Sequence, residues 1–131
     1  MDEGNIVTTG EQASAKATRT WRENIPATSN PAGSDGVCIA QIGPVAAGQN
    51  WFVEFVRIKH TSVTLLPTLE VFKNGQNDLS SIDSDLNGQD NFETFPTPGC
   101  WLGEGEILIF VWSGCDLASV GKANSQVRKD G

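Results

Sequence analysis

Residues 51–60 decide the fold class, and they read Trp51-Phe52-Val53-Glu54-Phe55-Val56-Arg57-Ile58-Lys59-His60. Side chains alternate between the two faces of a strand. Alternation predicts one face formed by Trp51, Val53 and Phe55 and an opposite face formed by Phe52, Val56 and Ile58. A strand that is apolar on both faces at its start belongs in the middle of a sheet. Its polar end is typical of a strand that leaves the core.

Short strands on both sides of this stretch extend the same pattern. We expect them at residues 37–42, 68–73, 106–113 and 118–128, with turns at Gly43-Pro44 and Asn74-Gly75. The last strand is the most polar and is expected at an edge. Residues 76–99 should be mostly loop, because Pro96 and Pro98 cannot lie in a central strand. Such spacing predicts an all-β protein, an antiparallel, jelly-roll-like β-sandwich.

The N-terminal residues differ in composition from the rest. Residues 1–34 are rich in Thr, Ala, Ser and Asn and have few apolar anchors. A free segment of this composition is disordered, because it cannot bury enough apolar area. We therefore expect an extended polar arm at residues 1–34, ordered only on a partner, and a β-sandwich domain at residues 35–131.

Charge and hydropathy limit the partners. The formal net charge is −7, and residues 76–95 carry five acidic residues and no Lys or Arg. With no basic stripe expected elsewhere, nucleic acid is not expected as a partner. The longest apolar run, residues 107–112, is far shorter than the roughly 20 residues of a membrane span. Residues 1–5 show no secretory signal, and no membrane partner is expected.

Three cysteines, Cys38, Cys100 and Cys115, form no Cys-x-x-Cys pair. An odd number favours reduced, partly buried thiols over a disulfide framework. A single bridge from Cys100 to either of the other two is the alternative.

One stretch resembles the first half of a calcium-binding loop, with oxygen ligands at Asp83, Asp85 and Asn87 before a glycine. The twelfth position, where a bidentate Glu is needed, is Thr94. We therefore interpret the stretch as a surface turn, and we expect neither a metal nor another cofactor.

Catalytic patterns are weak. His60 is the one histidine, and no Gly-x-Ser-x-Gly motif is present. Metal sites built from Cys and His lack the necessary spacing. We therefore expect a protein that is not an enzyme.

Two of the four tryptophans suggest surface roles. Trp101 follows a turn and could expose a ring that stacks on sugars. Trp21 lies in the expected arm between Arg19 and Arg22, and Trp and Arg dominate interface energetics. Together with Ile25, these residues are the candidates for a protein-binding anchor.

Residues 43–58 and 101–114 carry a family resemblance. Each begins with a glycine-containing turn and continues as a strand, and the second ends in Val111-Trp112-Ser113-Gly114. The two stretches resemble the small β-sandwich virion proteins of tailed bacteriophages, notably phages that infect actinobacteria. The resemblance covers roughly residues 36–128.

This resemblance implies a structural role, most concretely a head decoration (cement) protein on the capsid exterior. Its partner would be the major capsid protein, it would form a homo-oligomer (a trimer by analogy), and the virion would be assembled in the host cytoplasm. The alternative is a tail-fibre or carbohydrate-binding module that recognises a cell surface.

Overall fold

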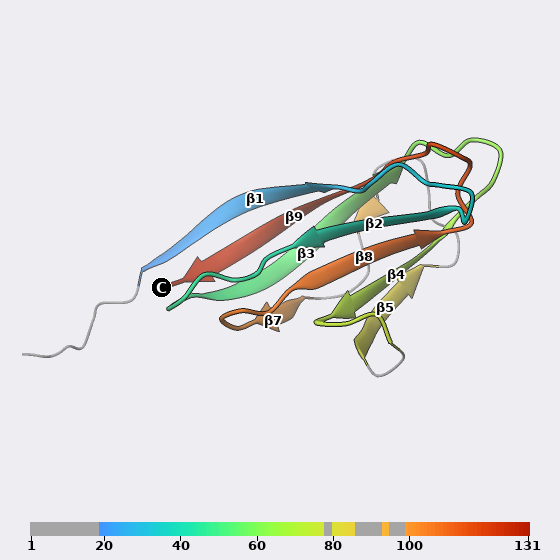
Figure 1. Cartoon of the computed structure of the whole chain (residues 1–131). Coiled ribbons are helices and arrows are strands. Elements are labelled where there is room, and N and C mark those ends of the chain that lie inside the picture. Colours follow the sequence, from blue (N-terminus) through green and yellow to red (C-terminus); the bar gives the residue numbers. More distant parts are fainter. Residues whose placement is uncertain (1–18, 78–79, 86–92, 95–98) are drawn as a thin grey trace, which may run out of the picture.

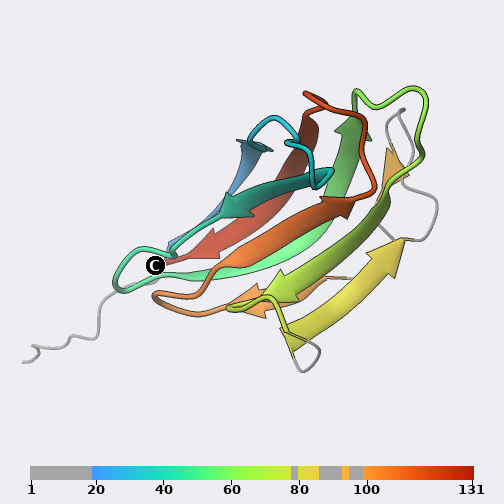
Figure 2. The ribbon, with the colours of Figure 1, turned by 45° about the vertical axis from the view of Figure 1, so that its right-hand side comes forward.

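A computed structural model describes residues 19–77, 80–85, 93–94 and 99–131, which form a two-layered β-sandwich (Figure 1). The strands of these residues are β1 (Thr20–Thr28), β2 (Val37–Ile42), β3 (Asn50–His60), β4 (Thr68–Lys73), β5 (Ser81–Asp85), β6 (Glu93–Thr94), β7 (Cys100–Leu102), β8 (Leu108–Ser113) and β9 (Gly121–Asp130). One sheet has the order β1-β9-β3-β6, with β7 also on β3. The other has the order β2-β8-β4-β5 (Figure 2). All pairings are antiparallel, so the predicted all-β antiparallel sandwich is confirmed.

Side chains from both sheets fill the space between the layers. The largest fully buried ones include Phe110 and Trp112 of β8, Leu69 of β4 and Ile58 of β3. Strand β8 is buried along most of its length, as its run of apolar residues predicts. Burial of this contiguous apolar cluster is the main stabilising contribution to the fold.

Strand β9 lies between β1 and β3, so the prediction that it forms an edge is wrong. Its inward positions carry small or apolar residues that are all buried: Gly121, Ala123, Ser125 and Val127. Small side chains let the strand approach the opposite sheet closely, while its polar residues occupy the outer face. A central strand can therefore be polar overall when one of its faces is exposed.

Residues 20–28 form β1, so the predicted arm over residues 1–34 is wrong for this stretch. The N–H groups of Arg19 and Gly131 donate to each other's carbonyl oxygens, at 3.1 and 2.9 Å. In this register odd-numbered N–H groups of β1 face β9 and even-numbered ones face the free edge. Pro26, whose ring suggested a loop, lies at an even position, where its missing N–H removes no bond of the ladder.

Strict alternation also fails within β3. The register with β9 shifts between Val53 and Phe55, which is a β-bulge at Glu54. After the bulge, Val56 and Ile58 face the core together with Val53, whereas Phe55 moves to the outer face beside Phe52. The predicted grouping of these side chains is therefore wrong beyond residue 53.

Candidate binding surfaces on the β1-β9-β3 sheet

The residues suggested as a protein-binding anchor lie together at the start of β1. The Arg19 guanidinium lies 5.1 Å from the centre of the Trp21 ring. Trp21 is half-buried, and its Nε1 donates to Glu23 Oε2 at 3.2 Å. Ile25 is also half-buried and packs against the core. The sandwich thus holds Ile25 against its core, and Trp21 lies half-buried on a strand instead of the expected arm.

Arg22 points to the outer face of the sheet and forms an ion pair with Glu54 of β3. Its Nε lies 3.0 and 3.1 Å from the two Glu54 carboxylate oxygens, and Gln126 Nε2 donates to Oε1 at 3.1 Å. The hydrogen bonds from Arg22 first and Gln126 second lower the pKa of Glu54. The bulge at Glu54 therefore places a carboxylate in the middle of the outer face, where β1 and β9 neutralise it.

The outer edge of β1 is open within the described part of the chain. Strand β1 ends the strand order of its sheet, and no described strand pairs with its free side. The backbone N–H groups of Thr20, Arg22, Asn24 and Thr28 face this side, because the odd-numbered groups bond β9. Such an edge is a template for a strand of another chain.

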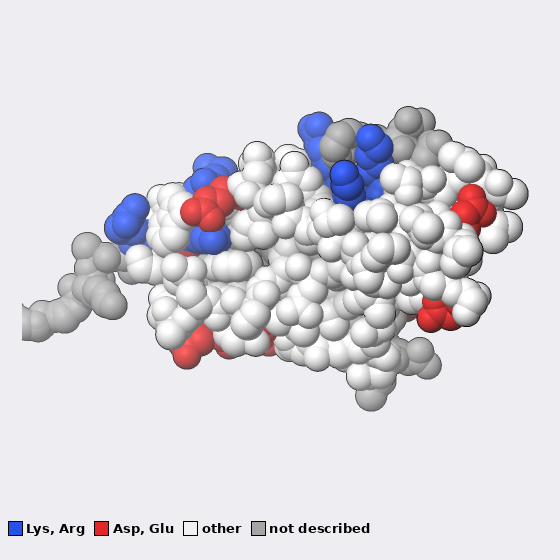
Figure 3. Space-filling model, turned by 45° about the horizontal axis from the view of Figure 1, so that its top comes forward, with Lys and Arg blue, Asp and Glu red and all other residues white. Residues whose placement is uncertain are grey.

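Basic side chains gather on the outer face of the same sheet. Five of the nine Lys and Arg residues of the sequence lie at its outward positions: Arg22, Arg57, Lys59, Lys122 and Arg128. Figure 3 shows basic groups at two places on this side, one of them accompanied by acidic side chains. The expectation that no basic stripe offsets the net negative charge is therefore wrong.

Three adjoining hollows cross this face, with volumes of about 190, 240 and 150 Å³. The first shares Arg57 and Asn124 with the second, and the second shares Asn24 and Gln126 with the third. The hollows therefore form one continuous shallow surface. We call it the basic groove; it follows β9 between the facing residues of β1 and β3.

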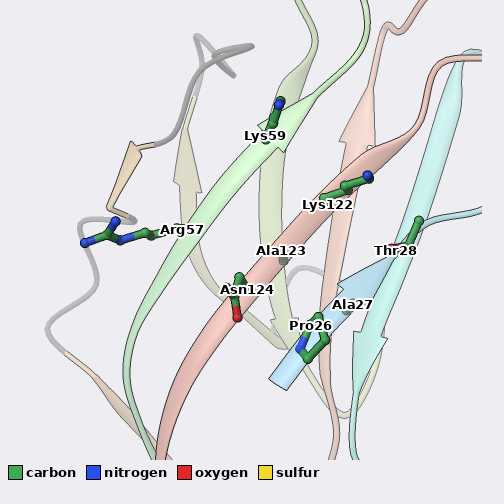
Figure 4. A pocket seen from close by; sticks show the side chains of 8 residues that line it. All are labelled: Pro26, Ala27, Thr28, Arg57, Lys59, Lys122, Ala123 and Asn124. Carbon is green, nitrogen blue, oxygen red and sulfur yellow. The ribbon is translucent and has the colours of Figure 1, made fainter. Parts of the chain in front are cut away.

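One end of the basic groove is cationic. Lys59 and Lys122 are direct cross-strand partners and both are exposed (Figure 4). Asn124 follows Lys122 on β9, Pro26 faces it from β1, and Arg57 extends away from β9. No described carboxylate forms an ion pair with either lysine. Within the described residues, this end therefore presents two exposed lysine side chains that have no ion-pair partner.

An aromatic cluster lies beyond the other end of the basic groove. The Phe52 and Trp101 ring centres are 4.9 Å apart, and the Arg128 guanidinium lies 5.2 and 5.4 Å from them. Trp101 is 48 % exposed, as its position after a turn predicts. An exposed indole beside a guanidinium offers both a flat apolar surface and a positive charge.

The other candidate residues do not assemble into a site within the described residues. Asp83 and Asp85 lie in β5, paired with Val71 and Leu69, so the expected surface turn is wrong for these two positions; Asn87 lies outside the described residues. No group of three His, Cys, Asp or Glu suited to a metal occurs among the residues searched. His60 is buried, and its Nδ1 accepts the N–H of Ser62 at 3.2 Å.

The positions of the cysteines match neither of the two disulfide bridges from Cys100 that the sequence left open. Cys38 and Cys115 are buried with their Sγ atoms 3.8 Å apart, whereas Cys100 is only partly buried. Burial is the main reason that the pKa of Cys115 rises to about 12, and the adjacent Cys38 adds to it. The Cys115 thiol therefore stays protonated at neutral pH, and both buried cysteines pack as small apolar groups.

The basic groove could not be identified from the sequence. A period of two is visible in Lys122, Asn124, Gln126 and Arg128 and again in Arg57 and Lys59. The two segments are more than sixty residues apart along the chain, and only the pairing of β3 with β9 brings them together. Alternation in the sequence indicates which residues of a strand face outward, but it does not indicate which strands lie side by side in the sheet.

Comparisons with known proteins add the following. No family model matches the chain, and no curated protein is significantly similar to it. Among solved structures, a virus-like particle of the extra small virus of the giant freshwater prawn Macrobrachium rosenbergii is similar at 12% identity and a TM-score of 0.39, over 96% of this chain and 88% of that one. The CBM36-1 domain of a multidomain xylanase from the hindgut metagenome of the termite Trinervitermes trinervoides is similar at 9% identity and a TM-score of 0.38, over 83% and 97%. At TM-scores below 0.5 these similarities indicate no shared function.

Two coarser statements remain. A β-sandwich of this kind is compatible with structural and binding roles alike. No helix among the described residues is long and apolar enough to cross a membrane.

Proposed function

We propose that this protein is a non-enzymatic structural component of a virus particle, most concretely a phage capsid decoration protein. It binds the exterior of the major capsid protein shell and stabilises it. The virion is assembled in the host cytoplasm, and several copies of the chain act together, as a trimer by analogy with related decoration proteins. The observation that carries this proposal is the open edge of β1.

The edge of β1 combines two features of a docking strand. Its outward N–H groups can form a ladder with a strand of the shell, which supplies affinity through main-chain hydrogen bonds. Trp21 and Ile25 lie half-buried along the same strand, with Arg19 beside the Trp21 ring. Aromatic and Arg side chains at the centre of an interface supply much of its binding energy.

The edge is also restricted in length. Pro26 removes the outward N–H at the seventh position of the nine-residue strand. A proline at an edge is one of the devices by which proteins prevent uncontrolled strand addition. The edge therefore favours a short, specific ladder along residues 20–24 over open-ended aggregation.

The test is co-sedimentation with undecorated capsids of the phage that encodes the chain. Asn24→Pro removes an outward N–H but no bond to β9, so it should keep the fold and weaken binding at least about tenfold. The matched control Asn24→Ala keeps the N–H and should bind like the wild type. Trp21→Ala should also weaken binding, by about 2 kcal/mol per contact if the indole is a buried anchor.

Two outcomes would overturn the proposal. If Asn24→Pro and Trp21→Ala, shown by circular dichroism to be folded, bind as well as the wild type, β1 is not the contact. If the wild-type chain does not bind shells at all, the alternative of a tail-fibre or carbohydrate-binding module takes its place.

A further inference from the structure

The pairing of Lys59 with Lys122 is unfavourable in the free protein. Like charges directly opposite each other on adjacent strands destabilise a sheet. No described carboxylate lies close enough to either lysine to form an ion pair, although the chain has 16 acidic residues and 9 basic ones. An anion bound between the two ammonium groups would remove this repulsion. The arrangement therefore points to an anionic ligand at this end of the basic groove.

The middle of the basic groove has a different chemistry. Asn24 and Asn124 line it, and neither side chain forms a hydrogen bond to a described residue. Free amides donate and accept hydrogen bonds at once, which suits hydroxyl groups. Glu54 lies nearby, held by Arg22 and Gln126. A negatively charged ligand group at this point would have to compete with this carboxylate for Arg22.

Positive charge returns at the far end with Arg128, beside the rings of Phe52 and Trp101. Lys122 and Arg128 are six residues apart on β9, which is about 20 Å at the usual rise of a strand. The surface therefore presents cations at both ends, amide groups and the Arg22–Glu54 ion pair between them, and an apolar ring surface at one end.

We propose that the basic groove binds an acidic polysaccharide whose carboxylate or sulfate groups are separated by uncharged, hydroxyl-rich units. Lys59 and Lys122 bind one acidic group, Asn24 and Asn124 bind hydroxyl groups, and Arg128 binds a second acidic group. Trp101 stacks against an apolar sugar face. This site shares Asn24 with the edge of β1 but lies on the face of the sheet, and it is tested separately through Arg57, Lys59, Lys122 and Trp101, none of which lies on β1.

A nucleic acid fits these observations less well. Its phosphates follow one another at short, regular intervals, and one of them would lie near Glu54. The net charge of −7 repels a polymer of that charge density over its whole length. A polysaccharide with spaced acidic groups meets cations only where the groove provides them.

The experiment measures binding of the whole chain to hyaluronan oligosaccharides, in which carboxylate-bearing units alternate with uncharged ones, and to a sulfated oligosaccharide by calorimetry, with neutral dextran and single-stranded DNA as comparisons. The groove variant carries Arg57→Gln, Lys59→Gln and Lys122→Gln. The control variant carries Ser34→Asp, Gln41→Glu and Lys73→Gln, which lower the net charge by the same amount away from the groove. A third variant, Trp101→Ala, tests the aromatic end.

We expect at least one acidic oligosaccharide to bind the wild type and dextran not to bind. Three exposed cation contacts together predict about tenfold weaker binding of the groove variant. The control variant should bind like the wild type. Trp101→Ala should weaken binding of both the carboxylated and the sulfated ligand.

Three results would overturn the proposal. Equal weakening in the control variant would show that only net charge matters. Binding of DNA without binding of either acidic oligosaccharide would assign the basic groove to nucleic acid. No binding of any probe by the folded wild-type chain would leave the groove without a polyanionic ligand.

Discussion

Gly121, the first residue of β9, lies directly against the ring of Trp112 in β8 of the opposite sheet. A Cβ atom at this position would lie 2.5 to 2.7 Å from three ring atoms of Trp112, which is itself fully buried. The ring cannot move away without disturbing the core around it, because protein interiors are close-packed. Glycine is thus required here by contact with Trp112.

We therefore predict that Gly121→Ala destabilises the protein by about 1–3 kcal/mol, as overpacked core positions do. Thermal or urea unfolding followed by tryptophan fluorescence measures the effect. Gly33→Ala is the matched control, since its Cβ would meet only an Asp35 oxygen at 3.6 Å. Equal stability of the two variants would contradict the role of the Trp112 contact.

Asp116 connects two loops at the end of the sandwich. Its carboxylate accepts the backbone N–H groups of Val63, Thr64 and Leu65 at 2.9, 2.7 and 3.1 Å. These bonds, with that from Thr64 the largest, lower the pKa of Asp116 below its usual 3.8. A carboxyl with a lowered pKa in the folded state stabilises the protein above its unfolded pKa, and the effect is lost as pH falls through the folded pKa.

We predict that Asp116→Ala lowers the melting temperature at pH 7 by roughly 5 °C and that the difference from the wild type shrinks below about pH 3.8. Melting curves between pH 7 and pH 2.5 test this. A difference that stays constant over the whole range would show that the carboxylate charge contributes nothing.

At the scale of elements, the strands that the sequence predicted correctly are those with a clear apolar signal. The predicted strands at residues 37–42 and 68–73 match β2 and β4, and β3 and β8 are found within a few residues of their predicted bounds. Their side chains fill the core, so periodicity and burial coincide.

Strands β1, β5, β6 and β7 were missed because pairing rather than pattern creates them. β1 contains a proline and few apolar residues, and it exists because β9 offers a nine-residue ladder. β5 likewise pairs with β4, although the sequence predicted that its residues lie in a loop. Edge strands need little apolar content of their own, because only one side of each is bonded. The protein-binding candidates Trp21, Arg22 and Ile25 therefore lie on a strand instead of the expected arm, and their role in binding stays a prediction.

Because residues 20–28 form a strand of the sandwich, N-terminal deletions should differ in their effect on stability. Removal of residues 1–33 should lower the melting temperature by roughly 10 °C or more, because it takes away β1 and the buried Ala27 and Ala32. Removal of residues 1–18 should leave it within about 2 °C, since all the pairings of β1 lie beyond them. Differential scanning calorimetry of the two deletion variants measures this difference. Equal melting temperatures would show that residues 20–28 do not stabilise the sandwich.

At the scale of the whole molecule, charge is distributed unevenly. The chain has a net charge of −7, yet five of its basic residues share one face of one sheet. At about 0.1 M salt the Debye length is about 10 Å, so a charged surface senses the nearest face more than the distant remainder. The protein should therefore behave as a cation toward surfaces that meet this face.

We predict that the wild-type chain is retarded on a sulfonated cation-exchange resin at pH 7 and about 0.1 M salt. The variant Arg57→Gln/Lys59→Gln/Lys122→Gln should elute in the void volume. The variant Ser34→Asp/Gln41→Glu/Lys73→Gln has the same net charge and should still be retarded. Identical elution of the two variants would mean that retention depends on net charge and not on the basic residues of this face.

The pairing between β1 and β9 affects how the protein can fold during translation. Thr20 is bonded to Asp130, a residue made 110 positions later. During translation, β1 and β3 emerge early and must wait for β9, which lies between them in the finished sheet. Contacts this distant along the chain slow folding. The sheet therefore closes only when β9 has left the ribosome, and until then a nascent chain exposes β1 and the β9-facing side of β3 to other chains being translated from the same mRNA.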